Sequence, residues 1–331
     1  MSFHSNSSTP NTFEHSPPED AGHLLARYKD AISQVEKVIL GKNAQVELMF
    51  VALLAKGHVL LDDTPGMGKT TMARAMAAVL GLNLHRIQFT SDLMPSDVVG
   101  VNVYHTPQGQ MPQPYFQPGP IFSNLLLADE INRASPRTQS ALLEAMAEQQ
   151  VTIDGVSHPL PNPFWVIATQ NPIDFSGTFP LPDSQMDRFM FRMVLGYPNE
   201  QSEMELLLGK SATNQQHLSK ILSEADVLKA QQIVGQQSVN ERLVKYVLRL
   251  LQGTRQHSDI VTGLSPRAGL SILQAARATS WLRNRDYVTP DDIQSVFVNS
   301  AAHRIVLGHH AHNQDVRRSI AEKILQSTPT P

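Results

Sequence analysis

The sequence contains no cysteine, which excludes disulfide bonds and thiolate metal sites. No apolar run reaches the roughly 18 residues that a membrane span requires, and no apolar signal core opens the chain. We therefore expect no membrane span and a cytoplasmic protein. The 13 histidines lack the close spacing of metal ligands, and the group His309, His310 and His312 is more typical of a solvated helix end.

Basic charge is scarce as well. The 27 Lys and Arg residues are outnumbered by 30 Asp and Glu residues, which gives a net charge of -3, and no basic stripe is present. A dedicated DNA-binding protein usually carries such a stripe, so nucleic acid is a disfavoured partner. The hydrophobic content of 41% is ample for packed cores, and 331 residues predict about two domains of roughly 100–200 residues each.

Three regions of the chain differ in pattern. Residues 1–20 are rich in Ser, Thr, Asn and Pro, have little to bury and are predicted to be a disordered tail. Residues 21–197 alternate apolar strands with amphipathic helices, which predicts an α/β domain built on a parallel sheet flanked by helices. Residues 198–331 show helical spacing and no strand-like alternation, which predicts a small all-α domain.

The apolar spacing also places individual elements. In the first domain, helices are predicted over residues 22–39, 43–56, 70–80 and 135–149, and strands over 58–61, 87–89, 124–128, 151–153 and 164–168. In the second, Asn199 is predicted to cap a helix, and further helices are predicted over 224–234, 240–252, 266–284 and 290–303. Residues 105–120 hold five prolines, which predicts a loop or hairpin insertion outside the core.

One strand-to-helix turn has the composition of a phosphate-binding loop. The strand at 58–61 runs into a segment that ends Gly68-Lys69-Thr70 and opens a helix. Backbone N–H groups and the helix N-terminus would hold phosphate oxygens, Lys69 would reach the β- and γ-phosphates, and Thr70 would ligate magnesium. The residues predicted to contact the nucleotide here are Asp63, Thr64, Pro65, Gly66, Met67, Gly68, Lys69, Thr70 and Thr71.

The loop departs from the full signature at Asp63, which stands where the signature has its first glycine. That glycine serves the turn geometry, and Asp tolerates a positive φ better than most residues, so we expect Asp63 to take the conformation of the glycine. The alternative is a surface turn that ends by chance in Gly-Lys-Thr. The apolar strand before the turn and the helix after it argue against that alternative.

Polar residues follow two further strands. Asp129 and Glu130 follow a strand of leucines, and Asn171 ends a later strand. Ligands of an α/β sheet gather at the carboxyl ends of its strands. Asp129 is therefore predicted to hold magnesium, Glu130 to polarise the attacking water as a general base, and Asn171 to orient that water. For Asn171, a simple turn before Pro172 is an equally good interpretation.

Phosphoryl transfer also needs cations that stabilise the charge on the transferring group. Arg188 and Arg267 are candidates, and such an arginine often comes from a neighbouring subunit. Arg133 and Arg137 are weaker candidates for interface or sensing roles. Taken alone, each arginine is more typical of a surface or ion-pair residue, so only the combination of motifs favours a catalytic role.

The motifs together resemble the MoxR family of AAA+ ATPases. After the phosphate loop, the resemblance rests on Leu125-Leu-Leu-Ala-Asp-Glu-Ile-Asn-Arg-Ala134, Ala168-Thr-Gln-Asn-Pro172, Leu181-Pro-Asp-Ser-Gln-Met-Asp-Arg-Phe189 and Ser265-Pro-Arg-Ala268, in that order. It covers about residues 22–310, and the combination is far more specific than any one of its motifs.

The resemblance implies a P-loop AAA+ core followed by a small α-helical lid. It assigns Lys69 and Thr70 to Walker A, Asp129 and Glu130 to Walker B, Asn171 to sensor 1, Arg188 to the arginine finger and Arg267 to sensor 2. Gly41 and Lys42 would lie near the adenine, residues 98–118 would be an insert of this AAA+ clade, and residues 150–158 would be a hairpin before sensor 1. The lid of this clade is displaced, so the resemblance leaves open whether Arg267 acts on the nucleotide of its own chain or on that of a neighbour.

The family usually assembles as hexameric rings, so the resemblance implies ATP and Mg²⁺ as cofactors and further copies of the same chain as partners. Its members are thought to remodel or activate proteins, often ones with a von Willebrand factor A domain and sometimes during metal or cofactor insertion. The leading hypothesis is therefore a magnesium-dependent, ring-forming ATPase that acts as a chaperone-like factor on a protein client.

Two other classes stay open at this point. A DNA-acting ring motor of the helicase type would use the insert as a DNA loop, but residues 105–120 contain no Lys or Arg to contact phosphates. A regulatory switch that binds nucleotide with negligible turnover would not need the pair Asp129 and Glu130. A gel shift with DNA and an assay of phosphate release would discriminate among the three.

Overall fold

The computed structural model describes residues 19–105, 113–171, 177–308 and 314–331. Its centre is a five-stranded parallel sheet with the order β2-β5-β8-β1-β9. The strands are β1 (His58–Asp62), β2 (Leu84–Gln88), β5 (Leu125–Asp129), β8 (Trp165–Gln170) and β9 (Phe189–Met193). Every residue of β1 and β5 is buried, as expected for central strands covered on both faces. The predicted parallel α/β sheet is thereby confirmed.

Alternate residues of a strand point to opposite sides of the sheet, so apolar side chains lie on both faces. Helices cover both of these faces. On one face, Val59 and Leu61 join a core with the helices α1 (Glu19–Val38), α2 (Asn43–Leu54) and α3 (Lys69–Leu80). On the other face, Leu60 joins a second core with α5 (Pro136–Glu148) and the short α4 (Pro95–Val99). Helix α1 begins at Glu19, inside the segment predicted as a tail.

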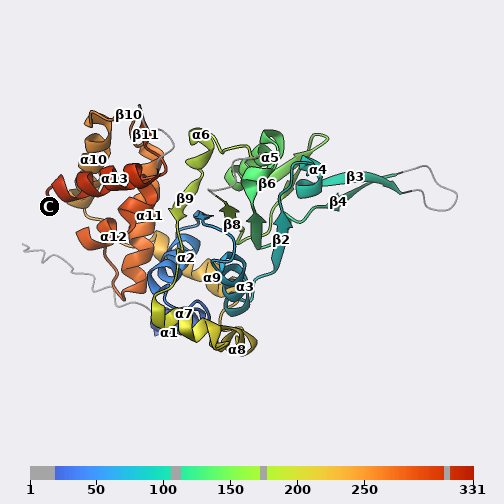
Figure 1. The fold of residues 1–331 in the computed structure, drawn as a ribbon, viewed down its shortest axis with the longest axis horizontal. Coiled ribbons are helices and arrows are strands. Elements are labelled where there is room, and N and C mark those ends of the chain that lie inside the picture. The colour runs from blue at the N-terminus through green and yellow to red at the C-terminus, as the bar shows by residue number, and fades with distance from the viewer. Residues whose placement is uncertain (1–18, 106–112, 172–176, 309–313) are drawn as a thin grey trace, which may run out of the picture.

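Two antiparallel hairpins leave the sheet on the α5 side. The longer consists of β3 (Gly100–His105) and β4 (Gln113–Pro118), and it extends away from the body of the protein in Figure 1. The shorter consists of β6 (Gln150–Ile153) and β7 (Val156–Pro159). The Phe116 ring stacks on His158 with centroids 4.0 Å apart, so the two hairpins lie in direct contact. Both occupy the places where an insertion and a hairpin were predicted.

The chain after β9 is largely helical, as predicted. It consists of α7 (Glu200–Leu207), α8 (Lys210–Gln216), α9 (Glu224–Gly235), α10 (Glu241–Gln256), α11 (Pro266–Leu282), α12 (Pro290–Ala301) and α13 (Gln314–Ser327). Asn199 caps α7 by accepting a hydrogen bond from the backbone N–H of Ser202 at 2.8 Å. Helices α10 to α13 lie together at one end of the molecule, opposite the long hairpin (Figure 1). In the parts of the chain that the structure describes, no helix has both the length and the apolar character needed to cross a membrane.

One expectation about strands was wrong, and one strand of the sheet was not predicted. The helical region contains a small antiparallel pair, β10 (Ile260–Thr262) with β11 (Val306–Leu307), although no strand was expected there. Such short strands carry too few residues for a period of two to stand out. Strand β9 was also not predicted. Phe189–Met193 is apolar at nearly every position, and the period of such a short run does not distinguish a buried strand from a buried helix. Residues 1–18, Pro172 and the histidines 309, 310 and 312 lie outside the described residues.

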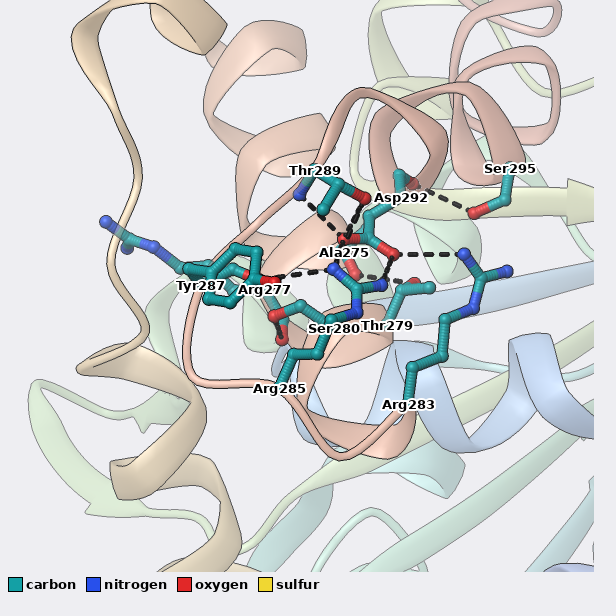
Figure 2. A network of polar contacts seen from close by, with 10 residues as sticks. All are labelled: Ala275, Arg277, Thr279, Ser280, Arg283, Arg285, Tyr287, Thr289, Asp292 and Ser295. Atoms are coloured by element: carbon teal, nitrogen blue, oxygen red, sulfur yellow. Dashed lines mark hydrogen bonds and ion pairs between the residues drawn. The ribbon is translucent and has the colours of Figure 1, made fainter. Parts of the chain in front are cut away.

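Helix α12 starts at a buried carboxylate. Asp292 accepts hydrogen bonds from Arg285 at 2.6 and 2.8 Å and from Arg283 at 3.0 Å, and it also accepts the backbone N–H of Thr289 at 2.8 Å (Figure 2). The Thr289 hydroxyl donates to the same carboxylate at 2.9 Å. This capping box fixes the turn between α11 and α12.

Candidate nucleotide-binding site

The turn between β1 and α3 has the shape of an anion cradle. Gly66 and Gly68 both have a φ of +88°, which only glycine adopts readily, and a Cβ built on either one would meet no atom within 4 Å. The space beside the backbone of both glycines is therefore open. Helix α3 begins at Lys69, so its free N–H groups and the positive end of its dipole face the same space. These features together suit a phosphate group.

Lys69 lies beneath this cradle with only 8% of its surface exposed. Its Nζ donates to the backbone carbonyl of Asp63 and, at 3.5 Å, to that of Gln170. Burial lowers the pKa of Lys69, while the nearby carboxylates of Asp63, Asp129 and Glu130 oppose that shift. A buried ammonium that is held by neutral carbonyls gains a stronger partner when an anion enters the loop.

Asp63 has a different role from the one predicted. The described non-glycine residues with positive φ do not include Asp63, so it does not copy the conformation of the signature glycine. Its carboxylate instead accepts the backbone N–H groups of Leu195 and Gly196, the latter at 3.2 Å. Burial raises the pKa of Asp63, and these two hydrogen bonds oppose the increase. Asp63 therefore ties the phosphate loop to the segment that follows β9.

Asp129 ends β5 as a buried carboxylate with defined partners. Its Oδ1 accepts the Thr169 hydroxyl at 2.6 Å, and its Oδ2 accepts Arg86 Nε at 3.1 Å and Arg86 Nη2 at 2.7 Å. Thr169 lies on β8 and Arg86 on β2, the two strands that flank β5 in the sheet. The neighbouring strands thus orient the Asp129 carboxylate and neutralise its charge.

Glu130 follows in the left-handed conformation, with a φ of 58°. Such a backbone is sparsely populated for residues other than glycine. Glu130 Oε2 accepts a hydrogen bond from Gln88 Nε2 of strand β2 at 2.9 Å and forms an ion pair with Arg133 at 2.9 Å. The Glu130 N–H also donates to the Thr169 hydroxyl at 2.9 Å. Thr169 therefore bridges both acids.

Sequence reasoning did not identify Arg86, Gln88 or Thr169 as site residues. Arg86 and Gln88 are two positions apart on β2, so they point to the same face. That spacing was visible in the sequence. It gave no indication of function, because only the pairing of β2 with β5 brings both side chains to Asp129 and Glu130.

Other predicted contacts gather around the same loop. Thr70 and Thr71 lie in the first turn of α3, and Asn171 follows β8 directly, with its backbone carbonyl accepting Asn132 Nδ2 at 3.3 Å. Gly41 has a φ of +72° and packs closely on Ser202, while Lys42 Nζ donates to the carbonyl of Tyr197 at 2.5 Å. The Gly41–Lys42 turn thus lies beside the segment that Asp63 holds.

Arg188 and Arg267 lie elsewhere. Both line a cavity of about 290 Å³ together with His58, the first residue of β1. Arg188 immediately precedes β9, whose first residue, Phe189, pairs with His58. Lys69, in contrast, follows the opposite end of β1. The two arginines therefore lie at the same cavity. The length of strand β1 separates them from the phosphate loop of their own chain.

The donors at the loop fit a magnesium ion bound with nucleotide. Thr70 offers a hydroxyl and Asp129 a carboxylate, which are the oxygen ligands that Mg²⁺ prefers, and Mg²⁺ usually takes only one or two protein ligands beside phosphate oxygens. Within the described ranges, no group of three or more His, Asp or Glu residues is arranged to hold a metal ion.

The fold and the loop define a nucleotide-binding ATPase of the AAA class. Residues 58–191 match the family model described as "ATPase family associated with various cellular activities (AAA)", and residues 252–325 match the model described as "AAA lid domain". The first match spans the sheet from β1 into β9, and the second runs from the end of α10 through α11 and α12 into α13.

Whole-length relatives narrow the class. Chaperone MoxR1 of Mycobacterium tuberculosis is 40% identical over 95% of this chain and 86% of its own length. YeaC of Bacillus subtilis, an uncharacterised protein, is 42% identical over 95% of this chain and 97% of its own. A crystal structure from Cytophaga hutchinsonii, provisionally assigned as an ATPase, superimposes with a TM-score of 0.85 at 37% identity and covers 95% of this chain and 97% of that one. The chain belongs to the MoxR family of AAA+ ATPases.

Proposed function

We propose that this ATPase hydrolyses Mg·ATP at the interface between neighbouring subunits of a ring, and that the ring is a hexamer. The observation that carries the proposal is the separation of Arg188 and Arg267 from Lys69. Strand β1 lies between them, and its five residues span roughly 16 Å at about 3.3 Å each. A separation of this size is longer than an arginine side chain, which supports the proposal that a second copy supplies both arginines.

The roles of the loop residues follow from their chemistry. The loop amides and Lys69 hold the β- and γ-phosphates, and Thr70 and Asp129 are the residues that would ligate Mg²⁺. When bound, the ion neutralises negative charge on the phosphate oxygens. Glu130 accepts the proton of the attacking water, and Asn171 orients that water. Arg188 and Arg267 of a neighbour stabilise the charge on the transferring phosphoryl group.

An uncovered apolar helix supports self-association. None of the residues of α7 is buried, although its end and the following residue read Met204-Glu-Leu-Leu-Leu208. Leu207 is 85% exposed and Leu208 68% exposed. Adjacent leucines exposed to this degree indicate an interaction surface. The helix starts beside the Gly41–Lys42 turn, and therefore at the nucleotide side where a neighbour must approach.

A chaperone-like role on a protein client is the best-supported purpose of the cycle. It rests on the relative named Chaperone MoxR1, and the resemblance that implied it also suggests a client with a von Willebrand factor A domain or a metalloenzyme under maturation. The hairpin of β3 and β4 is the surface that extends furthest from the body. Residues 98–118 contain no Lys, Arg, Asp or Glu, which suits a polypeptide better than a nucleic acid backbone.

Two substitutions test the chemistry. Lys69→Ala removes the ammonium beneath the loop, and we expect it to abolish binding of a fluorescent ATP analogue. Glu130→Gln keeps the shape of the side chain but cannot accept a proton, so we expect ATP to remain bound while turnover falls by about 10² to 10⁴-fold. Steady-state phosphate release measures the second effect. Normal turnover in Glu130→Gln would contradict the assignment of the general base.

The client is tested with the same variant. Glu130→Gln loaded with ATP should retain a client that the wild type releases, and affinity capture followed by mass spectrometry would identify it. Lys69→Ala is the matched control, because a protein captured equally by both variants does not depend on nucleotide. Capture of DNA in a nucleotide-dependent manner would instead favour the helicase-type motor.

A further inference from the structure

A third arginine, Arg304, lies between the segments that carry Arg188 and Arg267. It follows the end of α12 and is only 7% exposed. Its Nε forms an ion pair with Asp187 Oδ1 at 2.7 Å, and its Nη2 donates to the carbonyls of Phe189 at 2.9 Å and Asp187 at 3.3 Å. Its Nη1 donates to the Ser300 carbonyl at 2.8 Å.

These partners lie on both sides of Arg188 in the chain. Asp187 precedes Arg188 and Phe189 follows it, so the guanidinium of Arg304 holds the backbone around Arg188 at two points. The buried His303 ring adds a third bond to the same place, 3.0 Å from Nε2 to the Phe189 carbonyl. The backbone that directs Arg188 is therefore fixed from the C-terminal helices.

The same guanidinium reaches the helix that carries Arg267. Its Nη2 lies 3.5 Å from Ser271 Oγ on α11, one helical turn beyond Arg267. All three arginines line the one cavity described above. At its other end, α12 is fixed to the end of α11 through Asp292, Arg283 and Arg285 (Figure 2). Helix α12 is thus anchored at both ends, and its C-terminal anchor is shared with β9.

Burying the charge of Arg304 is unfavourable, so stability alone does not explain an arginine at this position. Burial lowers the pKa of Arg304 to about 10, although the Asp187 carboxylate opposes the shift. An apolar side chain of similar volume would often stabilise such a site as well or better. An arginine offers donors in a planar fork, which can join three segments of backbone at once, and lysine cannot do so.

We propose that Arg304 is a positioning residue that locks Arg188 and Arg267 into one rigid unit, so that both reach the nucleotide of a neighbouring subunit together. This inference rests on the proposed function, in which those two arginines act on a second copy. Arg304 itself contacts no substrate. Its loss should slow phosphoryl transfer on the neighbour while leaving the phosphate loop of its own chain intact.

The test uses Arg304→Lys, which keeps the charge and loses the fork. We expect unchanged affinity for ATP and a kcat lowered about 10- to 100-fold, since small misplacements of catalytic groups cost up to about 10²-fold. Asp187→Asn, at a half-exposed position, should shift kcat in the same direction by a smaller factor. Arg318→Lys, at an exposed arginine on α13, is the matched control and should leave kcat unchanged.

Mixed rings then separate positioning from misfolding. Glu130→Gln subunits cannot turn over but retain their arginines, so adding them to Arg304→Lys should restore hydrolysis at the Arg304→Lys sites. Arg188→Ala mixed with Glu130→Gln is the reference for action between subunits. Normal kcat in Arg304→Lys overturns the inference, and so does a slow Arg304→Lys that is not restored when Arg188→Ala is. If Arg188→Ala is not restored, the proposed function fails and the inference fails with it.

Discussion

At the scale of single residues, Asp63 shows how one position can satisfy a loop by a route that the motif does not describe. A glycine at this position would serve turn geometry. Asp63 keeps an ordinary backbone and uses its carboxylate to hold the N–H groups of Leu195 and Gly196. The phosphate loop is consequently joined to the chain that leads into α7, which is the surface proposed to meet a neighbour.

Asp63→Gly separates the two explanations. If backbone conformation were the reason for the residue, glycine would leave stability unchanged or raise it. Because the carboxylate satisfies two backbone N–H groups, one of them buried, we expect a loss of about 1–3 kcal/mol in the free energy of unfolding. Urea denaturation measures the change. Asp63→Asn, which retains one acceptor oxygen, should lose less.

At the scale of elements, the helical region depends on how α12 is anchored. Asp292 is fully buried, and burial by itself would raise its pKa. The hydrogen bonds from Arg285 and Thr289 outweigh burial and hold the pKa below its usual value. A carboxyl whose folded pKa is depressed contributes stability above its unfolded pKa, and that contribution is lost as the pH falls through the folded value.

We therefore expect Asp292→Asn to lower the free energy of unfolding by about 3 kcal/mol at pH 7, since breaking one side of a buried ion pair leaves the other side uncompensated. The difference from wild type should stay constant down to about pH 5 and narrow below about pH 4, where the carboxyl group becomes protonated in the unfolded state. It should disappear only as the pH falls through the lower pKa of folded Asp292. Thermal unfolding across this range measures it. The adjacent Asp291 is exposed, so Asp291→Asn should have little effect, and an equal loss in both variants would contradict the role of the network.

At the scale of the whole molecule, the residues proposed to act on ATP lie at two separate places. One surface carries the phosphate loop, Asp129 and Glu130, and the other carries Arg188 and Arg267. The proposed contact between them would be a heterologous interface, which closes into a ring when the rotation between copies permits. The exposed leucines of α7 belong to the helix that begins beside the Gly41–Lys42 turn.

Leu207→Lys tests that surface. Because Leu207 is 85% exposed, the substitution should leave the melting temperature of the subunit nearly unchanged. It places a charge in the proposed interface, so we expect a shift from ring to smaller species in light scattering with ATP present, and a parallel loss of ATPase activity. Leu207→Met keeps the apolar contact and should assemble normally. An unchanged particle size for Leu207→Lys would remove α7 from the interface.

The chemistry of contiguous segments could be predicted from the amino-acid order alone. The phosphate loop, the pair Asp129 and Glu130, and the alternation of strands with helices are local patterns, and each was readable because its residues are neighbours in the chain. The parallel sheet and the helical region followed from the same patterns, because apolar periodicity reports which faces of local elements must be buried.

Tertiary structure alone decided which distant residues meet. Arg86, Gln88 and Thr169 reach the two acids only because β2 and β8 flank β5, and strand order and register are not encoded in any single segment. Likewise, the pairing of β9 with β1 places Arg188 at the end of β1 opposite Lys69. The contact of Arg304 with the Phe189 carbonyl joins residues that are far apart in the chain. Neighbours in space that are far apart in the chain are set by global packing, and a local pattern contains no information about them.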